Sequence, residues 1–344
     1  MWWPSGWLAY VLPIVFVCSV IFWFTRGRRN PYSKTRYDGK VVLVIGGTAG
    51  IGKETVKDLV RKGAKVIFTG RQDQRAKEIQ EALKAESSTY KDADYFPCDL
   101  SDLDAVKNFC TAFLKNYNQL DILINNAGLL MPGLTKTKQG LEVTMGTNFV
   151  APIYLTSMLF SLLEKSSEAR IINVSSEAYK FDKMMSTKSR EDFLSAEETT
   201  TDYSSFGTYG KSKLGNIYFT QTLAKLLELK KKNNVKVVAL HPGAVMTDIN
   251  RTFSSGLRMI YNVLLPVIGL FMLTEEGGAQ TTLTVASMPF QDLPSGVFFA
   301  NCKAQSLIRL GKDDGLRINA WNQVTAALTR ITGETPFASL LSSN

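Results

Sequence analysis

The sequence is poor in the residues that build metal sites, disulfide frameworks and hydrolytic triads. Its 344 residues include one histidine, His241, and four cysteines that form no paired motif. Zinc sites need clustered cysteine or histidine ligands, small secreted folds need paired cysteines, and a Ser-His-Asp triad needs a histidine base. We therefore expect reduced thiols in a cytosol-facing domain, no metal, and a structural role for His241.

Acidic residues are scarce relative to basic ones: 31 Asp and Glu stand against 40 Lys and Arg, so the formal net charge is +9. One basic group, Lys230–Lys232, falls at an expected helix end, where cations suit the helix dipole. The other directly follows an apolar N-terminus, where it would face anionic lipid headgroups. This second group comprises Arg26, Arg28, Arg29, Lys34, Arg36 and Lys40. Its placement favours a membrane partner and no nucleic acid.

The N-terminus carries an uncharged apolar segment, Trp7 to Phe24, which is about long enough to cross a bilayer. No Lys or Arg precedes it and no small-residue cleavage pattern follows it, which favours an uncleaved anchor over a signal peptide. Positive charge on its C-terminal flank predicts a single-pass anchor with the rest of the chain in the cytoplasm. We expect the endoplasmic reticulum to be the membrane.

From residue 41 onward, apolar runs alternate with longer amphipathic stretches. The strand candidates are 41–45, 65–69, 94–97, 120–124, 170–175, 235–240 and 296–300. Strands that alternate with helices form parallel βαβ units. The prediction is an α/β fold: a single doubly wound Rossmann-type parallel sheet of about seven strands with helices on both faces, preceded by one N-terminal transmembrane helix.

The expected organisation is an anchor at 1–25, a basic linker at 26–39, a main domain at 40–335 and a C-terminal tail at 336–344. A surface insert at 182–206 is rich in Ser, Thr and charge. A substrate lid is expected at 254–275, because Met259 to Leu273 is apolar but short for a span. An ordinary core helix is the alternative for that stretch.

A glycine-rich turn, Gly-Gly-Thr-Ala-Gly-Ile-Gly at 46–52, links the first strand to a helix. Glycines let the backbone approach a pyrophosphate, and the helix N-terminus supplies partial positive charge. The spacing differs from Gly-x-Gly-x-x-Gly, and a plain tight turn is the alternative. The cofactor contacts predicted from this turn are Gly46, Thr48, Gly50, Ile51 and Gly52.

The second strand ends in Thr69-Gly70-Arg71, where NAD-binding proteins place a carboxylate for the ribose hydroxyls. A carboxylate would repel a 2′-phosphate, whereas a guanidinium can pair with it through two hydrogen bonds. Arg71 therefore favours NADP(H), the alternative being a solvated loop residue.

Further motifs resemble the short-chain dehydrogenase/reductase family from about residue 40 to about residue 315. They are Asn125-Asn126-Ala127-Gly128, Asn148, Ser175-Ser176 and Tyr209-Gly210-Lys211-Ser212-Lys213. Within the family the sequence resembles the membrane-bound retinol dehydrogenase-like branch, on Lys211 to Leu214, Phe219 to Gln221, His241 to Gly243 and Glu276 to Thr281. Two features depart from the family pattern: Ile45 replaces a usual threonine, and the gap between Ser176 and Tyr209 is long.

The resemblance implies roles for individual residues. Tyr209 would be the general acid, Lys213 would hold the nicotinamide ribose, Ser176 would orient the carbonyl, and Asn148 would keep a proton-relay water in place. Ser176 is preferred over Ser175 because the second serine of the pair usually fills that role. The further cofactor contacts that the resemblance implies are Asp99, Leu100, Asn126, Ala127, Gly128, Pro242, Gly243, Val245 and Thr247, beside Tyr209 and Lys213.

Two Tyr-x-x-x-Lys patterns occur, at Tyr209 and at Tyr179. Tyr209 is favoured because it opens an amphipathic helix, on which it shares a face with Lys213. At about 4 Å and an effective dielectric constant of 20, the ammonium would stabilise a phenolate by about 4 kcal/mol, or about three pKa units before desolvation opposes it. We therefore expect a lowered pKa for Tyr209.

Together these features predict an NADP(H)-dependent oxidoreductase that acts on a lipophilic retinoid, sterol-like compound or lipid aldehyde, with a homodimer as a candidate assembly. Two alternatives stay open. One is a catalytically idle Rossmann protein that acts as a membrane-tethered binding module, and the other is a tethered reductase of soluble substrates.

Overall fold

The computed structural model describes residues 28–87, 93–181, 192–194, 203–245 and 272–341. The predicted anchor at 1–25 lies outside the described residues, as do Thr247 and most of the predicted lid at 254–275.

The described residues form one eight-stranded sheet with the order β3-β2-β1-β4-β5-β6-β7-β8. All neighbouring strands are parallel except β7 and β8. The strands are β1 (Val41–Ile45), β2 (Lys65–Gly70), β3 (Asp94–Pro97), β4 (Ile122–Asn125), β5 (Ala169–Val174), β6 (Val235–His241), β7 (Phe298–Ala300) and β8 (Lys303–Gln305). The seven predicted strands are present in this mostly parallel sheet.

The eighth strand, β8, corrects the predicted number. Its three residues are all exposed at the sheet edge, so the strand lacks the apolar pattern by which a buried strand is recognised. It pairs with β7 through a tight turn in which Asn301 and Cys302 have φ angles of 52° and 59°.

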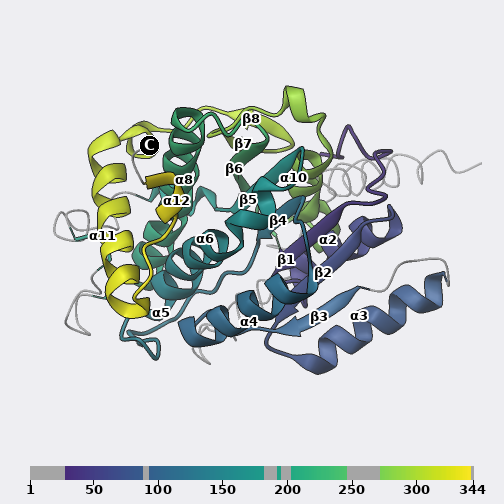
Figure 1. Ribbon diagram of the computed structural model, residues 1–344, viewed down its shortest axis with the longest axis horizontal. Coiled ribbons are helices and arrows are strands. Elements are labelled where there is room, and N and C mark those ends of the chain that lie inside the picture. The colour runs from purple at the N-terminus through teal and green to yellow at the C-terminus, as the bar shows by residue number, and fades with distance from the viewer. Residues whose placement is uncertain (1–27, 88–92, 182–191, 195–202, 246–271, 342–344) are drawn as a thin grey trace, which may run out of the picture.

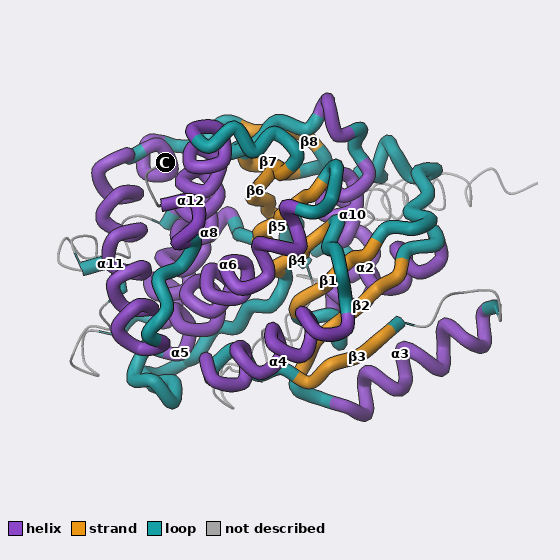
Figure 2. Tube along the Cα trace, viewed as in Figure 1, coloured by secondary structure: helices purple, strands orange, loops and turns teal. Residues whose placement is uncertain are grey.

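Helices cover both faces of the sheet (Figure 1, Figure 2). One face carries α2 (Gly50–Arg61), α3 (Asp73–Glu86) and α10 (Glu275–Ser287), and the other carries α4 (Leu103–Asn116), α6 (Ala151–Glu164), α8 (Ser205–Leu229) and α11 (Asp314–Thr332). Along β1, Val42 and Val44 belong to the core between the sheet and α2, α3 and α10. Leu43 and Ile45 belong to the core on the opposite face of the sheet. This alternation follows from the period of two along a strand and produces the predicted double winding.

Shorter elements complete the described chain. They are α5 (Val143–Met145), the π-helix η1 (Gly146–Val150), η2 (Glu177–Lys180), η6 (Phe290–Asp292), η7 (Arg309–Lys312) and α12 (Ala338–Leu341). Among the described residues, the continuous helical stretch Val143–Glu164 is long and apolar enough to cross a membrane, but 83% of its most apolar window is buried inside the domain. That burial is typical of a core helix.

Three predicted segments differ in the structure from what their names suggest. In the predicted linker at 26–39, Asn30 and Tyr37 are each only 3% exposed and pack on the domain. In the predicted tail at 336–344, Phe337 is buried and its ring lies 5.6 Å from that of Phe160. Contacts with residues distant in sequence, polar at Asn30 and apolar at Phe337, therefore extend the packed domain beyond both predicted boundaries.

Of the predicted surface insert at 182–206, residues 182–191 and 195–202 lie outside the described residues, and the described part contacts the core. Phe193 is 2% exposed, and its ring centre lies 5.6 Å from that of Phe149 and 5.9 Å from that of Tyr218. The helix α8 begins at Ser205, because the Ser204 hydroxyl caps it by accepting a hydrogen bond from the Gly207 amide at 3.0 Å. The insert therefore ends two residues earlier than predicted.

Candidate active site

The carboxyl ends of β1 and β4 lie side by side where the strand order reverses, which in doubly wound sheets is the position of the ligand crevice. The glycine turn lies there. Gly46 has a φ angle of +80°, and a Cβ at this position would stand 2.7 Å from the Cα of Ala127. A Cβ on Gly52 would collide with the carbonyl oxygen of Gly46. Both positions therefore require glycine if the turn is to pack this closely.

The segment after β4 braces this turn. The Asn126 side-chain amide donates a 2.8 Å hydrogen bond to the carbonyl oxygen of Gly46, and the Ala127 amide donates one of the same length to that of Ile45. The predicted cofactor positions Asn126, Ala127 and Gly128 are thus brought against the glycine turn.

The end of β2 lies on the other side of the turn. The Gly47 amide donates to the carbonyl oxygen of Thr69 at 2.8 Å, and Gly70 leaves room for the side chain of Thr48. Arg71 follows and is exposed. The side chain of Thr48 therefore requires a residue without a Cβ at position 70, which was not predicted from the sequence.

A cavity of about 350 Å³ opens between α2 and α3 beside this turn. Three cationic side chains line it, Lys53, Lys57 and Arg75, together with Glu78 and Glu275. Lys53 pairs with Glu275 at 2.6 Å, so part of this positive charge is already compensated. These cations were not among the residues predicted from the sequence, although Lys53 and Lys57 stand four residues apart on one helix.

The predicted cofactor contacts Asp99 and Leu100 follow β3. The Asp99 carboxylate accepts hydrogen bonds of 2.9 Å from the amide and the hydroxyl of Ser101, which fixes the turn, and Leu100 is buried. The Cys98 amide donates to the carbonyl oxygen of Gly70 at 3.0 Å, which ties this turn to the end of β2.

Asn148 lies fully buried within the π-helix η1. Its side-chain amide donates to the carbonyl oxygen of Leu129 and to Ser212 Oγ, and its Oδ1 accepts from the Leu129 amide at 2.8 Å. Pro152 stands four residues on and has no N–H, so the main-chain carbonyl of Asn148 receives no α-helical hydrogen bond from it. The side chain thus fixes the loop after β4, while the main-chain oxygen is the group suited to hold a water.

The two serines after β5 have different surroundings. The Ser175 hydroxyl is buried and donates to the carbonyl oxygen of Lys213 at 2.7 Å. The Ser176 hydroxyl accepts from the Ala178 amide at 3.2 Å and also makes a hydrogen bond with the Tyr209 hydroxyl. The Ser175 hydroxyl is therefore bonded to the main chain of α8, whereas the Ser176 hydroxyl is bonded to the Tyr209 phenol.

Tyr209 and Lys213 lie one turn apart on α8. Burial raises the pKa of Tyr209 to about 12 despite the hydrogen bond from Ser176, and burial lowers the pKa of Lys213 to about 8. The expected lowering of the Tyr209 pKa is therefore wrong for the protein alone. Desolvation outweighs the attraction, because the Lys213 ammonium lies 5.6 Å from the centre of the Tyr209 ring and donates to the carbonyl oxygen of Val174 at 3.0 Å.

The competing tyrosine, Tyr179, belongs to the hydrophobic core. Its side chain is buried, its ring centre lies 5.6 Å from that of Phe298, and its hydroxyl accepts a hydrogen bond of 3.4 Å from the Ile308 amide. Tyr179 therefore packs the core, and Tyr209 is the tyrosine that lies beside Ser176.

The stretch after β6 closes the described site. Gly243 has a φ angle of +99°, and Val245 is buried and bridges to Leu273. His241 accepts a hydrogen bond at Nδ1 from the Glu177 amide at 3.3 Å, and burial lowers its pKa to about 4. The neutral imidazole thus caps η2 beside Ser176, which agrees with the structural role expected for it.

Comparison with known proteins adds to this geometry. The family model for short chain dehydrogenases matches residues 40–187. Retinol dehydrogenase 14 from Homo sapiens is 34% identical over 298 residues, which cover 83% of this chain and 84% of the relative. Retinol dehydrogenase 12 from Homo sapiens is 33% identical over 284 residues, with 83% and 84% covered. A solved short chain dehydrogenase from Burkholderia cenocepacia in complex with NADP has the same fold, with a TM-score of 0.57 and 23% identity over 77% of this chain and 97% of that one.

Proposed function

Because the chain belongs to the short-chain dehydrogenase/reductase family, in its retinol dehydrogenase-like branch, we propose that it interconverts an alcohol and a carbonyl on a lipophilic substrate with NADP(H). The observation that carries the proposal is the convergence of Ser176, Tyr209 and Lys213 beside a glycine turn that has no room for a Cβ at Gly46 or Gly52.

The residues present fit a nicotinamide dinucleotide. Gly46, Gly50 and Gly52 let the backbone approach a pyrophosphate at the N-terminus of α2, where the helix dipole favours negative charge. Asp99 would meet the adenine, with Leu100 as a further cofactor contact, and Asn126, Ala127 and Gly128 would brace the ribose. Pro242, Gly243 and Val245 would contact the nicotinamide. Thr48 and Ile51 are further cofactor contacts at the glycine turn. When bound, the nicotinamide supplies or accepts the hydride.

NADP(H) is preferred over NAD(H) because β2 ends in Thr69-Gly70-Arg71, without a carboxylate that would repel a 2′-phosphate. The exposed Arg71 guanidinium can pair with the phosphate through two hydrogen bonds. Lys53, Lys57 and Arg75 add positive potential nearby, where they line the cavity between α2 and α3. The solved relative from Burkholderia cenocepacia is in complex with NADP.

In the reductive direction, Ser176 donates a hydrogen bond that orients the substrate carbonyl, and Tyr209 donates the proton that the carbonyl oxygen takes up. A phenol whose pKa is about 12 is fully protonated at neutral pH and therefore holds the proton until it is needed. The Lys213 ammonium stabilises the phenolate that remains. Asn148 holds the water through which the tyrosine regains its proton, by way of its main-chain oxygen.

A lipophilic substrate is favoured by two large exposed side chains close in sequence to the catalytic pair. Phe181, 56% exposed, follows η2 after Ser176, and Phe206, 48% exposed, lies in the first turn of α8 before Tyr209. Exposed aromatic side chains on both catalytic segments provide apolar contact for a substrate. We further propose that residues 1–25 anchor the chain in the endoplasmic reticulum membrane with 40–335 in the cytoplasm, and that 254–275 cover the substrate.

The test is NADPH oxidation by the detergent-solubilised full chain with retinaldehyde, a steroid ketone, a long-chain aldehyde and a short-chain aldehyde. We expect turnover of the lipophilic carbonyls, loss of that turnover in Tyr209→Phe, and weaker activity with NADH. Equal turnover of the short-chain aldehyde would instead support a tethered reductase of soluble substrates. Cofactor binding without turnover of any carbonyl would support an idle binding module.

A further inference from the structure

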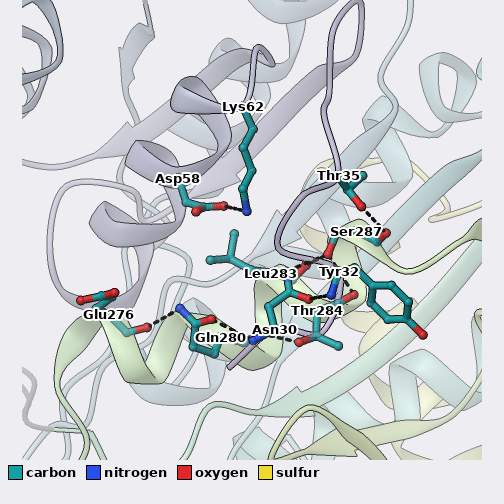
Figure 3. A network of polar contacts seen from close by, with 10 residues as sticks. All are labelled: Asn30, Tyr32, Thr35, Asp58, Lys62, Glu276, Gln280, Leu283, Thr284 and Ser287. Carbon is teal, nitrogen blue, oxygen red and sulfur yellow. Dashed lines mark hydrogen bonds and ion pairs between the residues drawn. The ribbon is translucent and has the colours of Figure 1, made fainter. Parts of the chain in front are cut away.

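Residues 28–38, here called the strap, lie along the outer face of α10 (Figure 3). Asn30 is the centre of this contact and is only 3% exposed. Its amide donates to Gln280 Oε1 at 3.0 Å, its side-chain amide donates to Ser287 Oγ at 2.8 Å, and its Oδ1 accepts from the Tyr32 amide at 2.8 Å. Asn30 thus contacts α10 at two positions that are two turns apart, through its main-chain amide at Gln280 and its side chain at Ser287.

The strap is fixed at both of its ends. At its C-terminal end, the Tyr37 amide donates to the carbonyl oxygen of Lys62 at 2.9 Å, and Tyr37 is buried. At its N-terminal end, Cys302 Sγ donates to the carbonyl oxygen of Arg28 at 3.4 Å. The strap therefore runs from the C-terminal end of α2, past α10, to the turn between β7 and β8.

This course places Arg28, the first described residue, at a defined edge of the sheet. Cys302 follows the carboxyl end of β7, and β7 is parallel to β6, whose carboxyl end leads to His241 and the candidate active site. Arg28, the N-terminal end of the strap, therefore lies at the same edge of the sheet as Tyr209 and Ser176. The amino edge of the sheet, marked by the exposed Asn233 before β6, lies on the opposite side.

The N-terminal end of the strap is basic. Arg28 and Arg29 are exposed there, and so is Lys303 directly after the β7–β8 turn. Arg36 is already paired with Asp38 at 2.9 Å, and α10 carries the exposed carboxylate of Glu276 in its first turn. An uncharged apolar stretch, Trp7 to Phe24, precedes these cations in the sequence. Such a combination suits a bilayer surface with anionic headgroups.

We propose that the strap, fixed to α10 by Asn30, holds the carboxyl edge of the sheet against an anionic bilayer surface. The candidate active site then faces the membrane. The inference rests on the proposed N-terminal anchor and goes beyond it, because an anchor on a loose linker would leave the domain free to turn. With the strap docked, only the short stretch between the apolar segment and Arg28 separates the domain from the membrane.

The experiment uses the full chain in phosphatidylcholine vesicles that contain about one third phosphatidylserine. Cys18 is replaced by alanine, and the buried Cys98, Cys110 and Cys302 are kept. A fluorophore is attached to a new cysteine at Lys303→Cys on the carboxyl edge or at Asn233→Cys on the amino edge. Quenching by a lipid-borne quencher is then measured with and without Asn30→Ala.

We expect at least severalfold stronger quenching at position 303 than at position 233, and a loss of most of this difference in Asn30→Ala while the chain still sediments with vesicles. Ser287→Ala removes the acceptor of the Asn30 side chain and should act in the same direction. Equal quenching at the two positions, an unchanged difference in both variants, or failure of the chain to sediment would each overturn the proposal. Because the readout needs no turnover, loss of the proposed activity would not affect it.

Discussion

Lys213 lies one helical turn beyond Tyr209 on α8, and its ammonium stands 5.6 Å from the centre of the tyrosine ring. The ammonium is held there by the carbonyl oxygen of Val174 at 3.0 Å. Both groups are desolvated, so the pKa of the phenol rises to about 12 and that of the ammonium falls to about 8. At neutral pH the pair therefore carries one phenolic proton and one positive charge, the state required of an acid whose conjugate base must be stabilised.

This pair predicts how reduction depends on pH. Tyr209 stays protonated well above neutrality, whereas Lys213 loses its charge as the pH rises through about 8. The reductive kcat should therefore fall above pH 8, as a pH–rate profile with NADPH and saturating carbonyl would measure. Lys213→Arg should lower the rate but remove that inflection, because a guanidinium stays charged. Tyr209→Phe should lower kcat by about 100- to 10,000-fold. A profile flat to pH 10 would contradict this assignment.

Gly128 leaves the room that Lys213 occupies. A Cβ at position 128 would stand 3.0 Å from Lys213 Nζ, so Gly128→Ala should displace the ammonium and lower kcat/KM by about tenfold, equivalent to about 1.4 kcal/mol. Gly133→Ala is the matched control in the same loop, because a Cβ there would meet nothing within 4 Å. If both variants kept the parent kcat/KM, the close approach at Gly128 would have no catalytic meaning.

Arg71 should decide between the two nicotinamide dinucleotides. A charge-assisted hydrogen bond contributes about 1.5 to 3 kcal/mol, so the loss of the equivalent of one such bond in Arg71→Ser should lower kcat/KM for NADPH by about 10- to 100-fold and leave that for NADH nearly unchanged. Arg330→Ser, on α11, is a control for general loss of positive charge. An equal loss with both dinucleotides would indicate a structural role for Arg71.

Phe193 should stabilise the domain although it lies in a segment predicted to be a surface insert. Its burial against Phe149 and Tyr218 predicts that Phe193→Ala lowers the free energy of unfolding by about 3 to 5 kcal/mol. The control is Phe181→Ala, whose side chain is 56% exposed and should leave stability almost unchanged while raising KM for a lipophilic substrate. Denaturant titration and steady-state kinetics separate the two effects.

His241 predicts a pH dependence of stability that can be assigned to one residue, because it is the only histidine. Its pKa falls from about 6.5 when unfolded to about 4 in the folded chain, so the unfolded state binds the proton first. The stabilisation is complete above pH 6.5 and is lost as the pH falls toward 4, by up to about 3 kcal/mol. The difference in unfolding free energy between the parent and His241→Gln should follow that slope. A constant difference would show that the imidazole is not held neutral.

The amino-acid sequence by itself determined the alternation of strands and helices, the glycine turn and the order of the motifs after β4, β5 and β6. These features are local: the period of apolar residues and the absence of side chains in a turn act within a few residues of chain. Parallel strands place their carboxyl ends at one edge of the sheet. The segments that follow these strands, which carry Asn126, Ser176 and Tyr209, therefore meet at that edge.

Tertiary structure alone decided what depends on partners distant in sequence. The edge strand β8 exists because β7 is there to pair with it, and Phe193, Phe337 and Asn30 are buried because α6, α8 and α10 offer surfaces that no local pattern describes. The pKa of Tyr209 is raised, not lowered as the sequence predicts, for the same reason. Helical spacing places an ammonium near the phenol, but only the packed site fixes how much water both groups lose, and that loss outweighs their attraction.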